Sequence, residues 1–172
     1  KKGIEPLPEH ITRMPIVVTP KDSRPADEIY VNIKKNKKLI KDFNWLKHGR
    51  IHNQTALIVS GGSSTDFTLL KQRARDTNTK VFCVKHSYPK LLANGISPFI
   101  CSILDPRPIT GRSTHGVIRK DLFKTINKDT LFLIASMTDP SVTKYLMKKG
   151  ANIKGWSAYS EALRDTSITD KL

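Results

Sequence analysis

The stretch Thr55-Ala-Leu-Ile-Val-Ser-Gly-Gly-Ser-Ser-Thr-Asp-Phe67 decides the fold of this chain. Its first half is apolar and rich in β-branched residues, which predicts a buried strand over Ala56–Ser60. Two glycines and small hydroxyl residues follow, and then a segment with helical spacing over Asp66–Asp76. A strand that passes through glycines into a helix brings free backbone N–H groups to one point, where they can bind an anion. We therefore expect phosphate binding at this turn.

The expected phosphate loop comprises Gly61, Gly62, Ser63 and Ser64, with the anion nearest to the first three. Ser63 and Asp66 have the spacing of a capping box, so Ser63 is the expected N-cap of the helix. The loop has neither the third glycine of a GxGxxG fingerprint nor the Gly-Lys-Ser/Thr of a Walker A loop. A tight turn without a ligand is the alternative interpretation.

Beyond this turn, apolar runs alternate with segments of helical spacing. Further strands are expected over Lys80–Lys85, Phe99–Leu104, Thr130–Met137 and Ile153–Trp156. Helices are expected over Pro89–Asn94, Lys120–Ile126, Pro140–Lys149 and Ser160–Arg164, with Asp139 as the N-cap of the third. Strands separated by helices predict an α/β fold, a Rossmann-like, doubly wound and mostly parallel sheet. Near-continuous apolar strands also predict a sheet that is covered on both faces.

The segment before the sheet has a different composition. Residues 1–27 contain five prolines and are expected to form an extended arm. Residues 28–47 have helical spacing, with lysines on the polar face. That face is either solvated or a surface for nucleic acid or a protein partner. Residues 28–172 are expected to form a single domain, because this length can bury one core.

The chain is strongly basic, with 30 Lys and Arg against 15 Asp and Glu and a net charge of +15. This charge favours nucleotides, nucleic acid, acidic lipids or an acidic partner, unless it is only a solvated basic surface. No apolar stretch approaches the roughly 20 residues that span a bilayer, and no signal peptide is recognised. Cys83 and Cys101 lie inside apolar runs, so we expect buried free thiols and a cytoplasmic location.

Polar residues that follow the predicted strands are the other candidates for chemistry. Asp105 ends the third strand and is expected to bind a ribose hydroxyl or a divalent metal such as Mg²⁺, unless it only starts a turn. His86 ends the second strand, where contacts to a base or ribose are common, or it is a packing residue. The absence of GxSxG, HExxH and paired Cys/His motifs from the sequence argues against a hydrolase.

The loop from Arg107 to Gly116 contains two arginines, one histidine and two glycines. We interpret it as a basic lid, in which Arg107 and Arg112 neutralise phosphate charge and His115 transfers a proton. Together with Asp105, Arg112 and His115 are the predicted catalytic residues. A solvated loop is the alternative.

Residues Thr55 to Gly155 resemble a family that pairs archaeal 6-hydroxymethylpterin pyrophosphokinase-like proteins with the motility-associated-factor flagellin glycosyltransferases. The resemblance is carried by Ala56-Leu-Ile-Val-Ser-Gly-Gly-Ser-Ser-Thr-Asp66, by Lys80-Val-Phe-Cys-Val-Lys-His86 and by Leu91-Leu-Ala-Asn-Gly-Ile-Ser-Pro-Phe-Ile-Cys-Ser-Ile-Leu-Asp-Pro106. The glycine loop is also similar to that of bacterial sialyltransferases. Two positions depart from the family pattern, because Ser64 replaces a loop proline and Phe99 replaces an acidic residue.

The resemblance implies a Rossmann-like nucleotide-binding fold, with the nucleotide at Gly61, Gly62, Ser63 and Asp105. The leading hypothesis is a transferase that uses a nucleotide or a nucleotide-sugar, with Mg²⁺ as a candidate cofactor. The alternative is a non-enzymatic basic protein that binds nucleic acid or an acidic partner. A third interpretation is a nucleotide-binding accessory module that pairs with another subunit.

Overall fold

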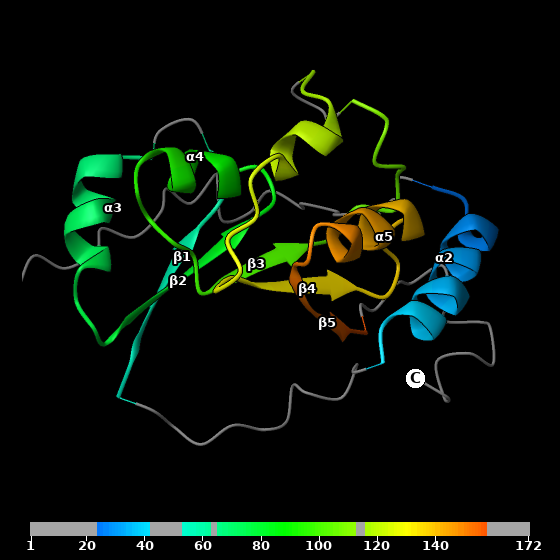
Figure 1. The fold of residues 1–172 in the computed structure, drawn as a ribbon, viewed down its shortest axis with the longest axis horizontal. Coiled ribbons are helices and arrows are strands. Elements are labelled where there is room, and N and C mark those ends of the chain that lie inside the picture. The colour runs from blue at the N-terminus through cyan, green and yellow to red at the C-terminus, as the bar shows by residue number, and fades with distance from the viewer. Residues whose placement is uncertain (1–23, 42–52, 63–64, 113–115, 158–172) are drawn as a thin grey trace, which may run out of the picture.

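The computed structural model describes residues 24–41, 53–62, 65–112 and 116–157. The strands are β1 (Thr55–Val59), β2 (Thr79–Val84), β3 (Ile100–Ile103), β4 (Leu131–Ala135) and β5 (Asn152–Trp156) (Figure 1). The helices are α2 (Ala26–Leu39), α3 (Phe67–Ala74), α4 (Tyr88–Ala93), the 3₁₀ helix η1 (Arg119–Phe123) and α5 (Pro140–Lys148). Among these helices, none is long and apolar enough to cross a membrane. Residues 1–23 of the expected N-terminal arm and the helix expected over Ser160–Arg164 lie outside the described residues. The arm was expected to extend to residue 27, but α2 begins at Ala26, so the last two residues of the expected arm are helical.

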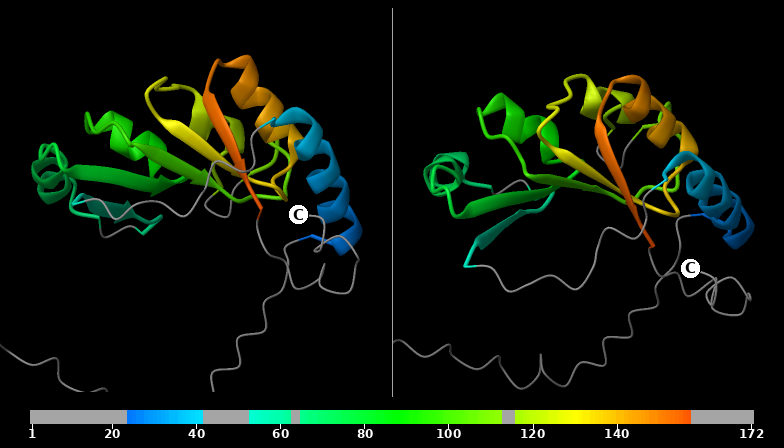
Figure 2. Two further views of the ribbon diagram at one scale, coloured as in Figure 1. Left: turned by 90° about the horizontal axis from the view of Figure 1, so that it is seen from below. Right: turned by 60° about the horizontal axis from the view of Figure 1, so that its bottom comes forward.

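All five strands are parallel and lie in the order β1-β2-β3-β4-β5. This arrangement confirms the predicted α/β class and the parallel, Rossmann-like sheet. The strand order follows the chain and does not reverse among the described strands, whereas a doubly wound sheet reverses its order once. Successive right-handed crossovers in one direction place their helices on one face. Figure 2 shows α3, α4, η1 and α5 on that same face.

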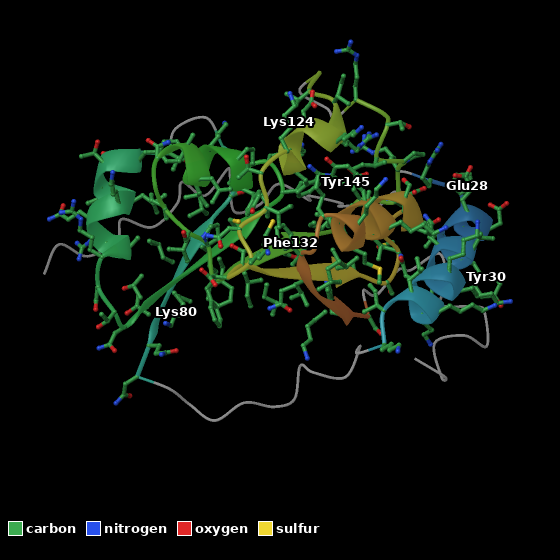
Figure 3. All side chains as sticks on the ribbon, viewed as in Figure 1. Glu28, Tyr30, Lys80, Lys124, Phe132 and Tyr145 are labelled. Atoms are coloured by element: carbon green, nitrogen blue, oxygen red, sulfur yellow. The ribbon has the colours of Figure 1, made fainter. Side chains whose placement is uncertain are left out.

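The main core lies between the sheet and these helices. Tyr88 of α4, Phe123 of η1 and Phe132 of β4 are buried and pack as a trio, with ring centroids 5.1 to 6.3 Å apart. Phe132 is among the residues labelled in Figure 3. Cys83 and Cys101 are neighbours in register across β2 and β3, and both are buried free thiols, as predicted. Burial raises the pKa of the Cys101 thiol well above its usual value.

The opposite face of the sheet is covered much less by the described residues. Ile58 of β1 is 78 % exposed, although the apolar pattern of its strand predicted burial on both faces. A smaller cluster forms at the other edge, where Ile29 and Ile33 of α2 pack with Ala135 and with Trp156 of β5. An apolar run cannot distinguish one covered face from two, and for this reason the expectation of a sheet covered on both faces differs from what the described residues show.

Candidate functional site

Four charged side chains meet just beyond the carboxyl ends of β2 and β3. Asp105 follows β3, and its side chain is only 2 % exposed. Its carboxylate accepts hydrogen bonds from Lys85 Nζ, from Arg107 Nε at 2.8 Å and from Arg119 Nε at 3.0 Å. The side chains of Lys85 and Arg119 are also largely buried, at 12 % and 6 % exposed. We call these four residues the Asp105 cluster.

The cluster carries three cationic side chains and one anionic side chain. Burial alone would raise the pKa of Asp105, but hydrogen bonds from Arg107 and Lys85 outweigh it and hold that pKa at about 2. Burial lowers the pKa of Lys85, and its hydrogen bond to Asp105 opposes this shift only in part. Because Asp105 is ionised at neutral pH, the cluster has an excess of positive charge that an anionic ligand would balance.

The chain between Arg107 and Arg119 folds back on itself and brings the second arginine to the cluster. Arg119 N donates to the Gly111 carbonyl at 3.0 Å, and Arg112 forms a bridge with Ile118. The guanidinium of Arg119 passes against Gly111, where a Cβ atom would collide with Nη1. Glycine at position 111 therefore leaves the space that the side chain of Arg119 needs to reach Asp105.

Two asparagines of α2 anchor this helix to the same end of the sheet. The buried Asn36 donates from Nδ2 to the carbonyls of Ser136 at 2.9 Å and Thr138 at 2.5 Å. Its Oδ1 accepts from Thr143 Oγ1 at 2.8 Å. Asn32, one helical turn earlier, donates to two further carbonyls at 3.3 Å, on residues that follow β3 and β4. These amides satisfy carbonyls at the strand ends, which would otherwise be buried without partners.

A pocket of about 620 Å³ lies at the same end of the sheet, beyond β1 and β2. Gly61, Gly62, His86, Lys90 and Asp121 are among its lining residues. Gly61 runs close to the second strand, since a Cβ there would lie 3.8 Å from the Cβ of His86. The structure thus brings three of the predicted binding residues to one cavity. The pocket adjoins the Asp105 cluster along the chain, because His86 follows Lys85 and η1 contributes to both.

The start of α3 differs from the prediction. Asp66, and not Ser63, is the N-cap, because its Oδ1 accepts from Thr68 N at 2.9 Å and Leu69 N at 3.0 Å. The expected capping box is therefore wrong. Asp66 occupies two of the N–H groups at the start of the helix, and its negative charge repels an anion there, which is why the anion was expected nearer to the glycines. The positive charge at this end of the sheet comes from the Asp105 cluster instead.

The remaining predicted residues are distributed as follows. Arg112 donates from Nη1 to the Gly116 carbonyl at 2.8 Å and takes no part in the Asp105 cluster. Ser63, Ser64 and His115 lie outside the described residues. Asp139 is the N-cap of α5 with Pro140 in the first turn, as predicted.

Sequence reasoning missed two residues of this region, Arg119 and Asn36. Lys85 was considered only as part of the segment Lys85-His86-Ser87 that ends the second strand, and it was given no role of its own. Arg119 comes 14 residues after Asp105 in the chain, and only the folded loop brings the two together. Asn36 lies in a helix whose interpretation depended on its lysines, so the buried hydrogen bonds of Asn36 were not predicted.

A parallel α/β sheet with a pocket at the carboxyl ends of its strands is typical of the class of Rossmann-like proteins. The family model described as 6-hydroxymethylpterin diphosphokinase MptE-like matches residues 27–170. The chain therefore belongs to this MptE-like family. Neither the comparison with curated proteins nor that with solved structures gave a match. The likeness to glycosyltransferases and sialyltransferases stays a prediction.

Proposed function

We propose that this protein binds a nucleotide through its phosphates at the carboxyl ends of β1 to β3 and transfers a phosphorus-containing group from it. Membership of the MptE-like family supports a transfer of the pterin diphosphokinase type. The observation that carries the proposal is the excess of positive charge in the Asp105 cluster, next to a pocket of about 620 Å³. A nucleotide-sugar donor is the second candidate from the sequence, and the same cations would suit its diphosphate.

The chemistry of such a transfer can be written for a nucleoside triphosphate donor and an alcohol acceptor. The acceptor oxygen forms a bond to the β-phosphorus, and the bond between that phosphorus and the α-phosphate oxygen breaks. The nucleoside monophosphate leaves, and the hydroxyl proton passes to the solvent or to a base. Arg107, Lys85 and Arg119 would stabilise negative charge on the transferred group. Arg107 is the most exposed of the three, so it is the one best able to contact phosphate directly.

The Asp105 cluster does not fit a protein-held Mg²⁺ ion. Both carboxylate oxygens of Asp105 accept from cationic donors, which repel a metal ion. No group of three or more His, Cys, Asp or Glu side chains that could hold a metal occurs in the described part of the chain. The metal role predicted for Asp105 stays a prediction that this arrangement does not favour. Any Mg²⁺ would enter with the nucleotide, on the substrate phosphates, as is usual for this ion.

Calorimetric titration with ATP, with and without Mg²⁺, and with CMP- and UDP-sugars tests the proposal. Arg107→Gln removes a charged donor and should weaken nucleotide binding by about tenfold or more. Gly62→Val adds a side chain to the lining of the pocket and should weaken nucleotide binding without changing the charge of the Asp105 cluster. Arg73→Gln, an exposed position of α3, makes the same charge change away from the pocket and should leave affinity unchanged.

Turnover is measured separately, as release of nucleoside monophosphate in the presence of a hydroxymethylpterin. The nucleotide-binding proposal fails if Arg107→Gln and Gly62→Val both bind nucleotides as the unaltered protein does. Binding without turnover of any donor would reduce the proposal to the accessory module that the sequence also allowed.

A further inference from the structure

A second groove lies at the opposite end of the sheet, where the strands begin. It has a volume of about 460 Å³ and runs between the end of α3, the start of β2 and the turn before β3. Lys71 and Arg75 come from the α3 side, and Lys80 comes from β2. Figure 3 labels Lys80 near the start of its strand. The acidic side chain among the described lining residues is Asp129.

The three cations of this groove have no carboxylate partner among the residues that the structure describes. No ion pair joins Lys71, Arg75 or Lys80 to an acidic side chain within 4.0 Å in that part of the chain. Lys71 Nζ lies 3.8 Å from the point that a Cβ would occupy at Gly95, another lining residue. The groove is therefore a positively charged surface that faces solvent.

A large aromatic residue, Phe99, also lines this groove. Phe99 is 47 % exposed although it directly precedes a buried strand. The rings of Phe82 and Phe99 pack edge to face, with their centroids 5.9 Å apart and their planes at 75°. Lys80 Nζ lies over the Phe99 ring, 5.7 Å from its centroid. We call Lys71, Arg75, Lys80 and Phe99 the Phe99 groove.

We propose that the Phe99 groove binds single-stranded nucleic acid. Sites of this kind combine cations that follow the phosphate backbone with aromatic rings on which bases stack. The exposed part of Phe99 would take one base, and Lys71, Arg75 and Lys80 would contact the phosphates on either side. An acidic peptide would use the cations but has no need of the ring. The net charge of +15 favours the approach of a polyanion to the whole molecule.

This site is separate from the proposed nucleotide site. Lys80 and Lys85 stand five residues apart in the chain at opposite ends of β2, which corresponds to about 16 Å along an extended strand. The Phe99 groove and the pocket beside Gly61 share no lining residue. A ligand at one end of the sheet therefore leaves the other end open.

The test is fluorescence anisotropy with a fluorescein-labelled oligouridylate of about eight nucleotides, so that the probe covers one site. Phe99→Leu should weaken binding at least fivefold, because base stacking on an aromatic ring is lost. Phe99→Tyr keeps a ring and should keep the affinity of the unaltered protein. Lys71→Gln with Lys80→Gln should weaken binding and lower the slope of log K against log salt by about 1.4, at about 0.7 per phosphate contact.

The matched control is Lys35→Gln with Lys38→Gln, which removes two exposed positive charges from α2 and should leave the salt slope unchanged. The proposal is overturned if this pair weakens binding as much as the groove pair, since general charge attraction would then explain the affinity. It is also overturned if Phe99→Leu binds normally, or if excess ATP displaces the oligonucleotide from the unaltered protein. A thermal unfolding curve for each variant excludes loss of the fold as the cause.

Discussion

Three cationic side chains lie at each end of the sheet, but their charges are paired with a buried carboxylate at one end and face solvent at the other. In the Asp105 cluster the cations are drawn from three segments and surround one buried carboxylate. In the Phe99 groove they face solvent beside an exposed ring. Buried charges are costly and depend strongly on their partners, whereas exposed charges are screened and contribute little to stability. The comparison shows that the same number of cationic side chains can stabilise the fold at one end of the sheet and form a solvent-exposed surface at the other.

The largest expected effect comes from removing the buried carboxylate. Asp105→Asn keeps the shape of the side chain but leaves Lys85, Arg107 and Arg119 without their anion. The free energy of unfolding should fall by about 3–5 kcal/mol, the usual cost of breaking a buried pair. Urea denaturation measures this change. Inorganic phosphate should restore part of the lost stability, because it can bind the unpaired cations in the folded state.

The control for this experiment is Asp121→Asn. Asp121 pairs with Lys124 at 3.3 Å on the surface, with side chains 38 % and 72 % exposed, so the change should cost less than about 1 kcal/mol. Equal losses for the two variants would mean that the Asp105 cluster is no more important to the fold than a surface pair.

A smaller effect is expected from acid. The pKa of Asp105 is about 2 in the folded protein and returns toward its ordinary value of 3.8 on unfolding. Because the folded pKa is depressed, the stabilisation is present above about pH 4 and is lost as pH falls toward 2. The difference amounts to about 2 kcal/mol. It is measured as the stability of the unaltered protein minus that of Asp105→Asn, followed from pH 5 to pH 2.5. If this difference in stability does not become smaller as the pH falls, Asp105 is not the ionised partner of the three cations.

The smallest effect is expected in the Phe99 groove. Lys71→Gln and Lys80→Gln should each change the free energy of unfolding by less than about 0.5 kcal/mol, because neither lysine has a described carboxylate partner. Urea denaturation of the two variants checks this at low salt. A loss near that of Asp105→Asn would show that the groove cations stabilise the fold, and would remove the contrast between the two ends.

Local patterns in the sequence predicted most of the elements. The apolar runs and their spacing identified all five strands to within two residues, because each strand buries at least one face in the core. The pair Asp139 and Pro140 marked the start of α5, since both capping and the fixed proline φ act within one turn. The buried thiols of Cys83 and Cys101 followed from their apolar neighbours in the same way.

Arrangements between distant segments could not be read from those patterns. The sequential strand order, the exposure of Ile58 and the position of Asn36 under the strand ends depend on which elements pack together. The choice of Asp66 as N-cap shows the same limit at short range, because Ser63 and Asp66 both suit a helix start.

The sequence by itself determined the alternation of strands and helices and the chain's membership of the MptE-like family. Only the tertiary structure decided that Asp105 meets Lys85, Arg107 and Arg119, and that Phe99 stands exposed among cations. The physical reason is the range of the forces. Hydrophobic periodicity and capping act over a few neighbouring residues, whereas a buried charge finds its partners only after the strands have paired and the loop after β3 has closed.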